Sequence, residues 1–144
     1  MKDDRCLIDS NILVYAYDKS DTLKHEKCLK ILRECFKGNS LLAVSIQNLS
    51  EFFVIITRKV QKPLLPSQAK IIVQDIVNSN YFVKIEPQKE QVLEAINLSM
   101  EKGISYWDSL IAAAMKKHDI FCIYTENEKE FKKIEWLNVV NPLK

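Results

Sequence analysis

The sequence predicts an α/β fold, in which a parallel sheet is covered by helices on both faces. Short apolar runs alternate along the chain with longer segments of helical periodicity, which is the pattern of βαβ units. The chain contains 2 glycines and 4 prolines, fewer than a loop-rich all-β fold would need. Its length of 144 residues is typical of one domain, which we expect to span residues 1–144.

Five short apolar runs are predicted to be strands. The first, Cys6-Leu7-Ile8, ends in the turn-forming cluster Asp9-Ser10-Asn11. The third contains β-branched and aromatic residues, which favour extended backbone. The predicted strands cover residues 6–8, 41–44, 81–85, 121–124 and 138–140.

The segments between the strands are predicted to be helices, because apolar residues recur in them at helical spacing. Ser45, Ser67 and Ser105 are expected to be N-caps, and Gly103 is expected to stop a helix. The predicted helices cover residues 12–17, 22–36, 46–60, 68–78, 88–102 and 106–117, with a short helix after residue 127 that ends at 133.

The charge balance and the hydropathy exclude some classes of protein. Lys and Arg number 21 and Asp and Glu 19, so the net charge of +2 does not by itself indicate a nucleic acid or a membrane partner. No apolar run reaches the ~18–20 residues that span a membrane. Residues 1–5 include acids where a signal peptide would have basic and then apolar residues. We therefore expect a cytoplasmic protein with no membrane partner.

The four cysteines are predicted to be buried free thiols. Cys6, Cys28, Cys35 and Cys122 lie among apolar residues, and no two of them form a C-x-x-C pair. In a reducing compartment this pattern favours small buried side chains over zinc ligands or disulfides.

Polar residues at the ends of two predicted strands are the first candidates for chemistry. Asp9 directly follows the first strand, and Thr125, Glu126 and Asn127 directly follow the fourth. Ligands of parallel α/β sheets bind outside the carboxyl ends of the strands, where the strand order reverses. If both strands are central, these side chains meet at one edge of the sheet.

Two predicted helices add carboxylates to this set. Glu51 borders an apolar row that should face the core, and Asp108 lies in the first turn of its helix. A border residue that reaches water would explain Glu51 alone, and an acid that answers the helix dipole would explain Asp108 alone. The prediction therefore depends on their convergence. The apolar row comprises Leu49, Phe52, Phe53 and Ile56.

Several carboxylates in one cleft would repel one another, and a hard divalent cation would remove that cost. Oxygen ligands of this kind suit Mg²⁺ or Mn²⁺. Zinc is not expected, because His25 and His118 fall on predicted helix surfaces.

Four short motifs, in this order, resemble those of the PIN-domain ribonucleases, and most closely the VapC-type toxins of toxin–antitoxin pairs. They are Leu7-Ile8-Asp9-Ser10-Asn11-Ile12-Leu13, Asn48-Leu49-Ser50-Glu51-Phe52, Trp107-Asp108-Ser109-Leu110-Ile111-Ala112-Ala113-Ala114, and Tyr124-Thr125-Glu126-Asn127 up to Phe131. The resemblance implies a three-layer α/β/α fold with a central parallel sheet of about five strands. It also implies metal-dependent cleavage of RNA.

The resemblance also assigns roles to residues. Asp9, Glu51 and Asp108 would hold Mg²⁺ or Mn²⁺, which would activate water for attack on a phosphodiester. The fourth family position, often Asp, is Asn127, so Glu126 or Glu130 could supply the missing carboxylate. Ser10 and Thr125 match hydroxyl positions that orient the acids, with Asn11 as a further supporting residue. Basic side chains expected to follow the RNA phosphates are Arg58, Lys59, Lys62, Lys116 and Lys117.

The family further implies a small antitoxin protein that covers the acidic cleft, and a homodimer. Exposed apolar candidates for the dimer are Tyr15, Tyr17, Phe36 and Phe53, although each could equally belong to the core.

One alternative stays open from the sequence, namely a PIN-fold module that binds RNA or protein without cutting it. Asn127 at the fourth position favours this alternative, and the three retained acids oppose it. A response-regulator phosphoacceptor does not fit, because the third strand ends in Glu86-Pro87. A haloacid-dehalogenase phosphatase does not fit either, because Asp9-Ser10-Asn11 lacks its Asp-x-Asp motif.

Overall fold

The computed structural model describes residues 5–144. Residues 1–4 lie outside this range, and they include most of the N-terminal residues on which the prediction of no signal peptide was based. Five parallel strands form one sheet in the order β3-β2-β1-β4-β5. All five predicted strands are confirmed, and their bounds shift by at most one residue. They are β1 (Cys6–Ile8), β2 (Leu42–Ser45), β3 (Phe82–Ile85), β4 (Cys122–Tyr124) and β5 (Asn138–Val140).

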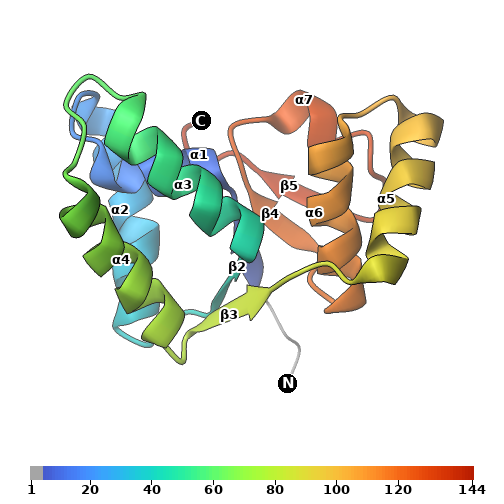
Figure 1. The fold of residues 1–144 in the computed structure, drawn as a ribbon, viewed down its shortest axis with the longest axis horizontal. Coiled ribbons are helices and arrows are strands. Elements are labelled where there is room, and N and C mark those ends of the chain that lie inside the picture. Colours follow the sequence, from blue (N-terminus) through green and yellow to red (C-terminus); the bar gives the residue numbers. More distant parts are fainter. Residues whose placement is uncertain (1–4) are drawn as a thin grey trace.

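Seven helices among the described residues complete a three-layer α/β/α arrangement, as predicted (Figure 1). The helices α1 to α4 lie on one side of the sheet, and α5 to α7 lie on the other. Their bounds are α1 (Ser10–Tyr17), α2 (Thr22–Phe36), α3 (Ile46–Arg58), α4 (Pro66–Asn78), α5 (Lys89–Lys102), α6 (Tyr106–Lys117) and α7 (Glu128–Phe131). No helix within residues 5–144 is long and apolar enough to cross a membrane.

Capping residues fix most helix ends where the sequence predicted them. Ser45 caps α3 in a reciprocal capping box with Asn48, and Ser105 accepts from the backbone N–H of Asp108 at the start of α6. Gly103 ends α5 in the left-handed conformation at φ 66°.

The predicted start of α4 is wrong. Ser67 was expected to cap a helix beginning at residue 68, but Pro66 is the first helical residue and Leu65 is the N-cap. Proline is well suited to the first helical position because its fixed φ matches the helix and its missing N–H would have no partner there.

Successive side chains of each strand point to opposite faces of the sheet, so a hydrophobic core forms on each face. Ile8, Val44 and Phe82 pack with α1 to α4, whereas Leu7 and Ala43 pack on the opposite face with α6. This alternation follows from the period of two in a strand.

The apolar row of α3 faces the core only in part. Leu49, Phe52 and Ile56 are buried as predicted, but Phe53 is 37% exposed. Positions 49, 52 and 56 follow the i, i+3, i+7 spacing of one narrow stripe, and position 53 lies at its edge.

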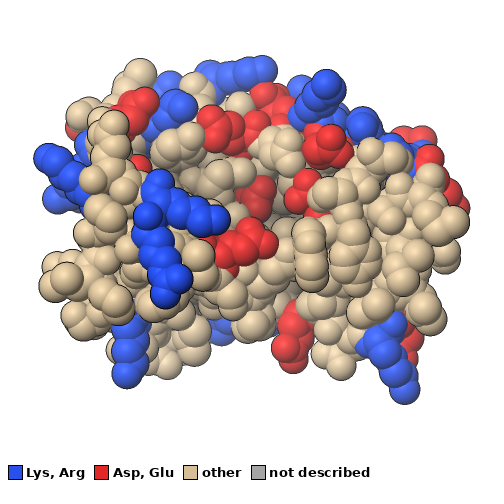
Figure 2. Space-filling model, turned by 45° about the horizontal axis from the view of Figure 1, so that its top comes forward, with Lys and Arg blue, Asp and Glu red and all other residues tan. Residues whose placement is uncertain are grey.

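The strand order reverses between β1 and β4, which is where a parallel α/β sheet places its ligands. The chain runs from β1 outward to β2 and β3, then crosses to β4 and β5 on the other side of β1. Figure 2, in which the side of α1 and α7 comes forward, shows acidic side chains gathered in a hollow and basic side chains around it.

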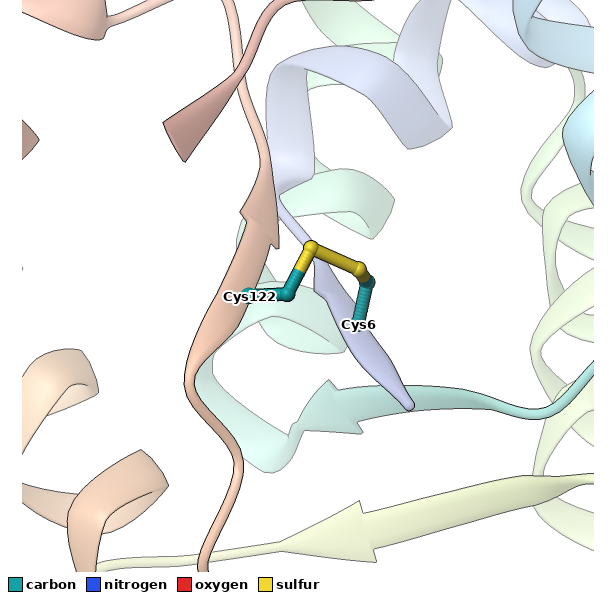
Figure 3. Close-up of a disulfide and its surroundings, with 2 residues drawn as sticks. All are labelled: Cys6 and Cys122. Atoms are coloured by element: carbon teal, nitrogen blue, oxygen red, sulfur yellow. A yellow bond between two sulfur atoms is a disulfide. The ribbon is translucent and has the colours of Figure 1, made fainter. Parts of the chain in front are cut away.

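The prediction of four free cysteines is wrong for two of them. Cys6 and Cys122 form a disulfide that joins β1 to β4 (Figure 3), whereas Cys28 and Cys35 are free and buried. The two bonded residues are register partners, and their Cα atoms lie 4.5 Å apart, within the range that a disulfide spans. Since they are 116 residues apart in the sequence, only the strand register brings them together.

Candidate active site

The ends of β1 and β4 lie side by side at the centre of the site. The backbone N–H of Asp9 donates to the carbonyl oxygen of Tyr124 at 3.0 Å. Thr125 Oγ1 donates to Asp9 Oδ2 at 2.7 Å, across 116 residues of sequence. Parallel pairing of the two central strands therefore places an acid and a hydroxyl in direct contact.

Asp9 is buried, and four donors converge on its carboxylate. Oδ1 accepts from the backbone N–H of Ser10 at 2.8 Å and from Asn48 Nδ2 at 3.3 Å. Oδ2 accepts from Asn11 Nδ2 at 3.3 Å, in addition to Thr125. Donors to an ionised carboxylate are among the stronger hydrogen bonds, so this arrangement fixes the orientation of Asp9.

Burial raises the pKa of Asp9 from 3.8 to about 6, in spite of the hydrogen bonds from Thr125 and Ser10, which lower it. The negative charges of Asp108 and Glu51 raise the pKa of Asp9 further. Since opposite charges act in the reverse sense, a cation among these three acids would favour their ionised forms.

Glu51 reaches the site from the second turn of α3. Its Oε2 accepts from Ser10 Oγ at 2.9 Å, and its Oε1 accepts from Gln47 Nε2 at 2.9 Å. Ser10 thus contacts one acid through its backbone and another through its side chain. α3 begins directly after β2, which places this turn of the helix beside the end of β1.

Asp108 enters from the first turn of α6, and Asn127 contacts it directly. Asn127 Nδ2 donates to Asp108 Oδ2 at 3.0 Å, and the backbone N–H of Asn127 donates to Thr125 Oγ1 at 2.9 Å. Burial raises the pKa of Asp108, and hydrogen bonds from Ser105 and Asn127 oppose this rise. The charges of Glu130 and then Glu51 raise the pKa of Asp108 further.

The side chain of Glu126 is engaged elsewhere. Its Oε2 accepts from Tyr15 Oη at 2.8 Å, and its Oε1 lies 3.5 Å from Lys24 Nζ. Its backbone N–H donates to Asn11 Oδ1 at 3.2 Å, so Asn11 links Asp9 to the segment after β4.

The predicted basic residues occupy different places. Arg58 lies seven residues after Glu51 on α3, hence on nearly the same face of the helix, and Lys59 is the C-cap. Lys116 is at the other end of α6 from Asp108, and its Nζ lies 5.8 Å from the centroid of the Trp136 ring. Along their helices, Arg58 lies seven residues from Glu51 and Lys116 lies eight residues from Asp108.

Two contacts in the site were missed by sequence reasoning. Asn48 is fully buried and donates to Asp9, and Gln47 donates to Glu51. The spacing Ser45-x-x-Asn48 resembles a capping box, which was the available signal for a fixed polar side chain at position 48. The i, i+4 spacing of Gln47 and Glu51 was a signal for the second contact.

The oxygen donors suit a hard divalent cation. Within residues 5–144, no three His, Cys, Asp or Glu side chains stand close enough together to hold one ion. Nevertheless, the charges of Asp108 and Glu51 raise the pKa of Asp9, and the charge of Glu51 raises the pKa of Asp108. Glu130 Oε2 is buried and has no hydrogen-bond partner among residues 5–144. Unneutralised buried oxygens and mutual repulsion are what Mg²⁺ or Mn²⁺ would relieve.

The fold and the acidic site define a class of protein. Residues 6–137 match the family model of the PIN domain, which is nearly the whole chain. This chain therefore belongs to the PIN domain family, as its resemblance predicted.

Solved structures with the same fold include several toxins. A toxin–antitoxin complex from Klebsiella pneumoniae has a TM-score of 0.67 and 20% identity, over 95% of this chain and 97% of that chain. VapC20 from Mycobacterium tuberculosis, a sarcin–ricin loop cleaving toxin, has a TM-score of 0.68 and 14% identity, over 88% of this chain and 93% of that chain. VapBC2 from Rickettsia felis, bound to a promoter DNA fragment, has a TM-score of 0.63 and 22% identity, over 94% of this chain and 96% of that chain.

A search of curated protein sequences gave no match. At these identities the structural similarity establishes the fold, and the family assignment comes from the sequence match over residues 6–137.

Proposed function

We propose that this chain is a metal-dependent endoribonuclease and the toxin of a toxin–antitoxin pair. The observation that carries the proposal is the convergence of Asp9, Glu51 and Asp108 at the strand switch point of a PIN domain. Three elements far apart in sequence supply these acids. A core that needed only stability would not gather three repelling charges there.

The residues of the chain would prepare the site for hydrolysis. Thr125 and the backbone of Ser10 hold the carboxylate of Asp9, the hydroxyl of Ser10 holds Glu51, and Asn127 holds Asp108. When bound, Mg²⁺ or Mn²⁺ supplies Lewis-acid stabilisation of the phosphodiester and a water of lowered pKa. Asp9, Glu51 and Asp108 are the residues that would hold it.

The proposed substrate is RNA, and Arg58 and Lys59 are the proposed phosphate contacts. One structural neighbour is a toxin that cleaves the sarcin–ricin loop, which supports RNA as the substrate class. Two others are complexes of toxin–antitoxin systems, which supports a small antitoxin as the partner. A cytoplasmic location, which the substrate requires, belongs to the same proposal.

A cleavage assay tests this function. Total tRNA, a ribosomal RNA hairpin and a single-stranded oligonucleotide would be incubated with the protein in Mg²⁺, Mn²⁺ or EDTA. We expect cuts that require metal and that fall by at least about 100-fold in Asp9→Asn and Asp108→Asn, because each variant removes a charged ligand. Glu128→Gln, an acid variant outside the site, should keep wild-type activity.

The alternative is a module that binds RNA without cutting it, and Asn127 is the observation that favours it. Folded protein that binds RNA but gives no cuts with any metal, and that gains activity in Asn127→Asp, would establish this alternative. Cleavage by the wild type would exclude it.

A further inference from the structure

Trp107 is a large apolar side chain that is exposed next to the acids of the site. It is 62% exposed, and it directly precedes Asp108 in the first turn of α6. Its ring lies against the ring of Tyr106, with the centroids 5.2 Å apart and an interplanar angle of 70°. Tyr106 packs in turn on a buried cluster between α5 and α6, so the indole is held from one side. A single exposed apolar residue is common on a protein surface, so the location of this one matters more than its exposure.

The row of α6 to which Trp107 belongs faces the sheet. Positions 107, 111 and 114 follow the i, i+4, i+7 spacing of one helix face. Ile111 and Ala114 are buried in a core cluster that also contains Leu7 of β1 and Ala43 of β2. Trp107 extends this row by one turn towards the start of α6, and the side chains of a helix tilt in that direction.

This first turn of α6 is level with the segments that follow the strands. β4 ends at Tyr124, and Asp108, the neighbour of Trp107, contacts Asn127 beyond that end. The buried part of the row therefore packs on the strands, whereas Trp107 faces the space outside their carboxyl ends. Asp9 follows the end of β1 in the same place.

We propose that Trp107 is a substrate-binding residue that stacks on a nucleobase of the RNA next to the phosphodiester to be cleaved. This inference rests on the proposed function and deepens it, because it concerns the same site. It adds to the acids and the basic residues a contact that recognises a base and not a phosphate.

The chemistry of single-stranded nucleic acids favours this role. Proteins that bind them combine basic groups along the backbone with aromatic rings on which bases stack, and every base offers a π-face. Arg58 and Lys59 are the proposed phosphate contacts at the end of α3, and Trp107 supplies the ring from α6. A base in a duplex is already stacked on both faces, so the substrate should carry an unpaired base beside the cut.

A nucleobase fits this position better than a protein does. The neighbours of Trp107 include the polar residues Ser105 and Asp108, so the indole does not extend an apolar stretch of its own segment. Protein-binding surfaces are usually contiguous apolar patches of several hundred Å². One indole is sufficient for one base.

Tryptophan fluorescence tests the contact directly, because the chain contains only Trp107 and Trp136. Trp136 lies near the other end of α6, where Lys116 Nζ is 5.8 Å from its ring centroid. A single-stranded RNA oligonucleotide would be titrated in Mg²⁺ into Asp9→Asn protein, so that the RNA stays intact. Adding Trp136→Phe should leave a fluorescence that the RNA quenches, and adding Trp107→Phe should leave one that it does not.

Affinity provides the second measurement. In the same background Trp107→Ala should raise the Kd for the oligonucleotide by at least about fivefold, the usual effect of losing one aromatic stack. Trp107→Phe should stay within about threefold of its parent, because it retains an aromatic face. Ile71→Ala, which removes an equally exposed apolar side chain from α4, should leave the Kd unchanged. Circular dichroism and thermal unfolding would show that each variant is folded.

Cleavage kinetics separate binding from chemistry. In an otherwise wild-type chain Trp107→Ala should raise KM with little change in kcat, as expected when a contact made equally in the ground state and the transition state is lost. The same RNA annealed into a duplex should be cut poorly by the wild type and should not respond to Trp107→Ala.

The failure of this inference can be told apart from failure of the proposed function. If the chain binds and cuts RNA while Trp107 is not quenched and Trp107→Ala keeps the affinity, the stacking role is overturned and the ribonuclease stands. The indole would then be a contact for a protein partner. Trp107→Phe as weak as Trp107→Ala would also overturn stacking. If the wild type neither binds nor cuts RNA, the proposed function itself fails.

Discussion

Asp9 illustrates how the burial of a single carboxylate in the proposed active site opposes the stability of the fold. Its side chain is 6% exposed, yet it carries a group that water would solvate far better. The four donors around it offset this cost only in part, because its pKa remains raised. The metal-free fold therefore carries a cost that the proposed cation would relieve.

This cost should appear as a pH dependence. Between pH 4 and pH 6 the folded protein binds more protons at Asp9 than the unfolded chain does, so stability falls as the pH rises through this window. Relative to Asp9→Asn, which cannot titrate there, the unfolding free energy of the wild type should fall by up to about 3 kcal/mol between pH 4 and pH 7. Urea unfolding in EDTA at four pH values measures the difference.

Asp75→Asn is the control for this experiment, because Asp75 is exposed on α4. Its curve should run parallel to that of the wild type. If the Asp9→Asn curve is also parallel, Asp9 is not the group whose burial sets this slope.

Individual residues of the site could be predicted from the sequence when they lie at the end of a strand, at the border of an apolar helix face or in the first turn of a helix. Asp9, Glu51 and Asp108 were found because strand ends, helix borders and first turns are visible as breaks in periodicity. The contact from Asn48 to Asp9 could not be found, because it depends on which strand lies beside the start of α3. The unpaired oxygen of Glu130 could not be found either, because it depends on the tertiary surroundings of α7. The sequence offered Glu126 before Glu130 as the replacement carboxylate, but the contacts with Tyr15 and Lys24 engage the side chain of Glu126 away from the other acids.

At the scale of the elements, local chemistry determined what could be predicted. The bounds of α2 and α6 were predicted to the residue, because caps and apolar stripes agree there. α4 began earlier than predicted, because proline was taken as a break and not as a first helical residue. The disulfide was missed because a pairing between two strands leaves no local signal.

The disulfide should contribute measurably to stability. It closes a loop across 116 residues, and such cross-links typically stabilise a fold by about 2–5 kcal/mol. We expect dithiothreitol to lower the unfolding free energy by an amount in this range, measured by urea unfolding. The double variant Cys6→Ser with Cys122→Ser should be equally destabilised and should not respond to dithiothreitol.

A thiol count checks the bond itself. Denatured, unreduced protein should release two titratable thiols, from Cys28 and Cys35, and reduced protein should release four. Four thiols before reduction would show that the pair is open in the purified protein, as a reducing cytoplasm favours.

At the scale of the whole molecule, the outer face of α5 is a candidate dimer surface. It exposes four apolar side chains that fall within about 100° of the helix circumference, namely Val92, Leu93, Ile96 and Met100. A stripe of this kind is typical of a surface that another protein covers. The family resemblance implies a homodimer but no particular face. We propose that a second copy of the chain packs on this face of α5 and not on Tyr15 and Tyr17, which pack against the core.

Sedimentation velocity tests this interface. The wild type should sediment as a dimer, and the pair Leu93→Glu with Met100→Glu should shift it to the monomer, because charge in an apolar interface is costly. Leu23→Glu, which is exposed on α2, should leave the dimer intact. A wild-type monomer at all concentrations would contradict the prediction.

The strand order has a consequence for the synthesis of the protein on the ribosome. β1 is made first but lies at the centre of the sheet, and its partner β4 comes near the end of the chain. Until β4 has been translated, Asp9 lacks Thr125, and the acids of α6 and α7 have no scaffold beside it. A ribosome that makes this proposed ribonuclease therefore meets a finished active site only after nearly all of the chain has left it.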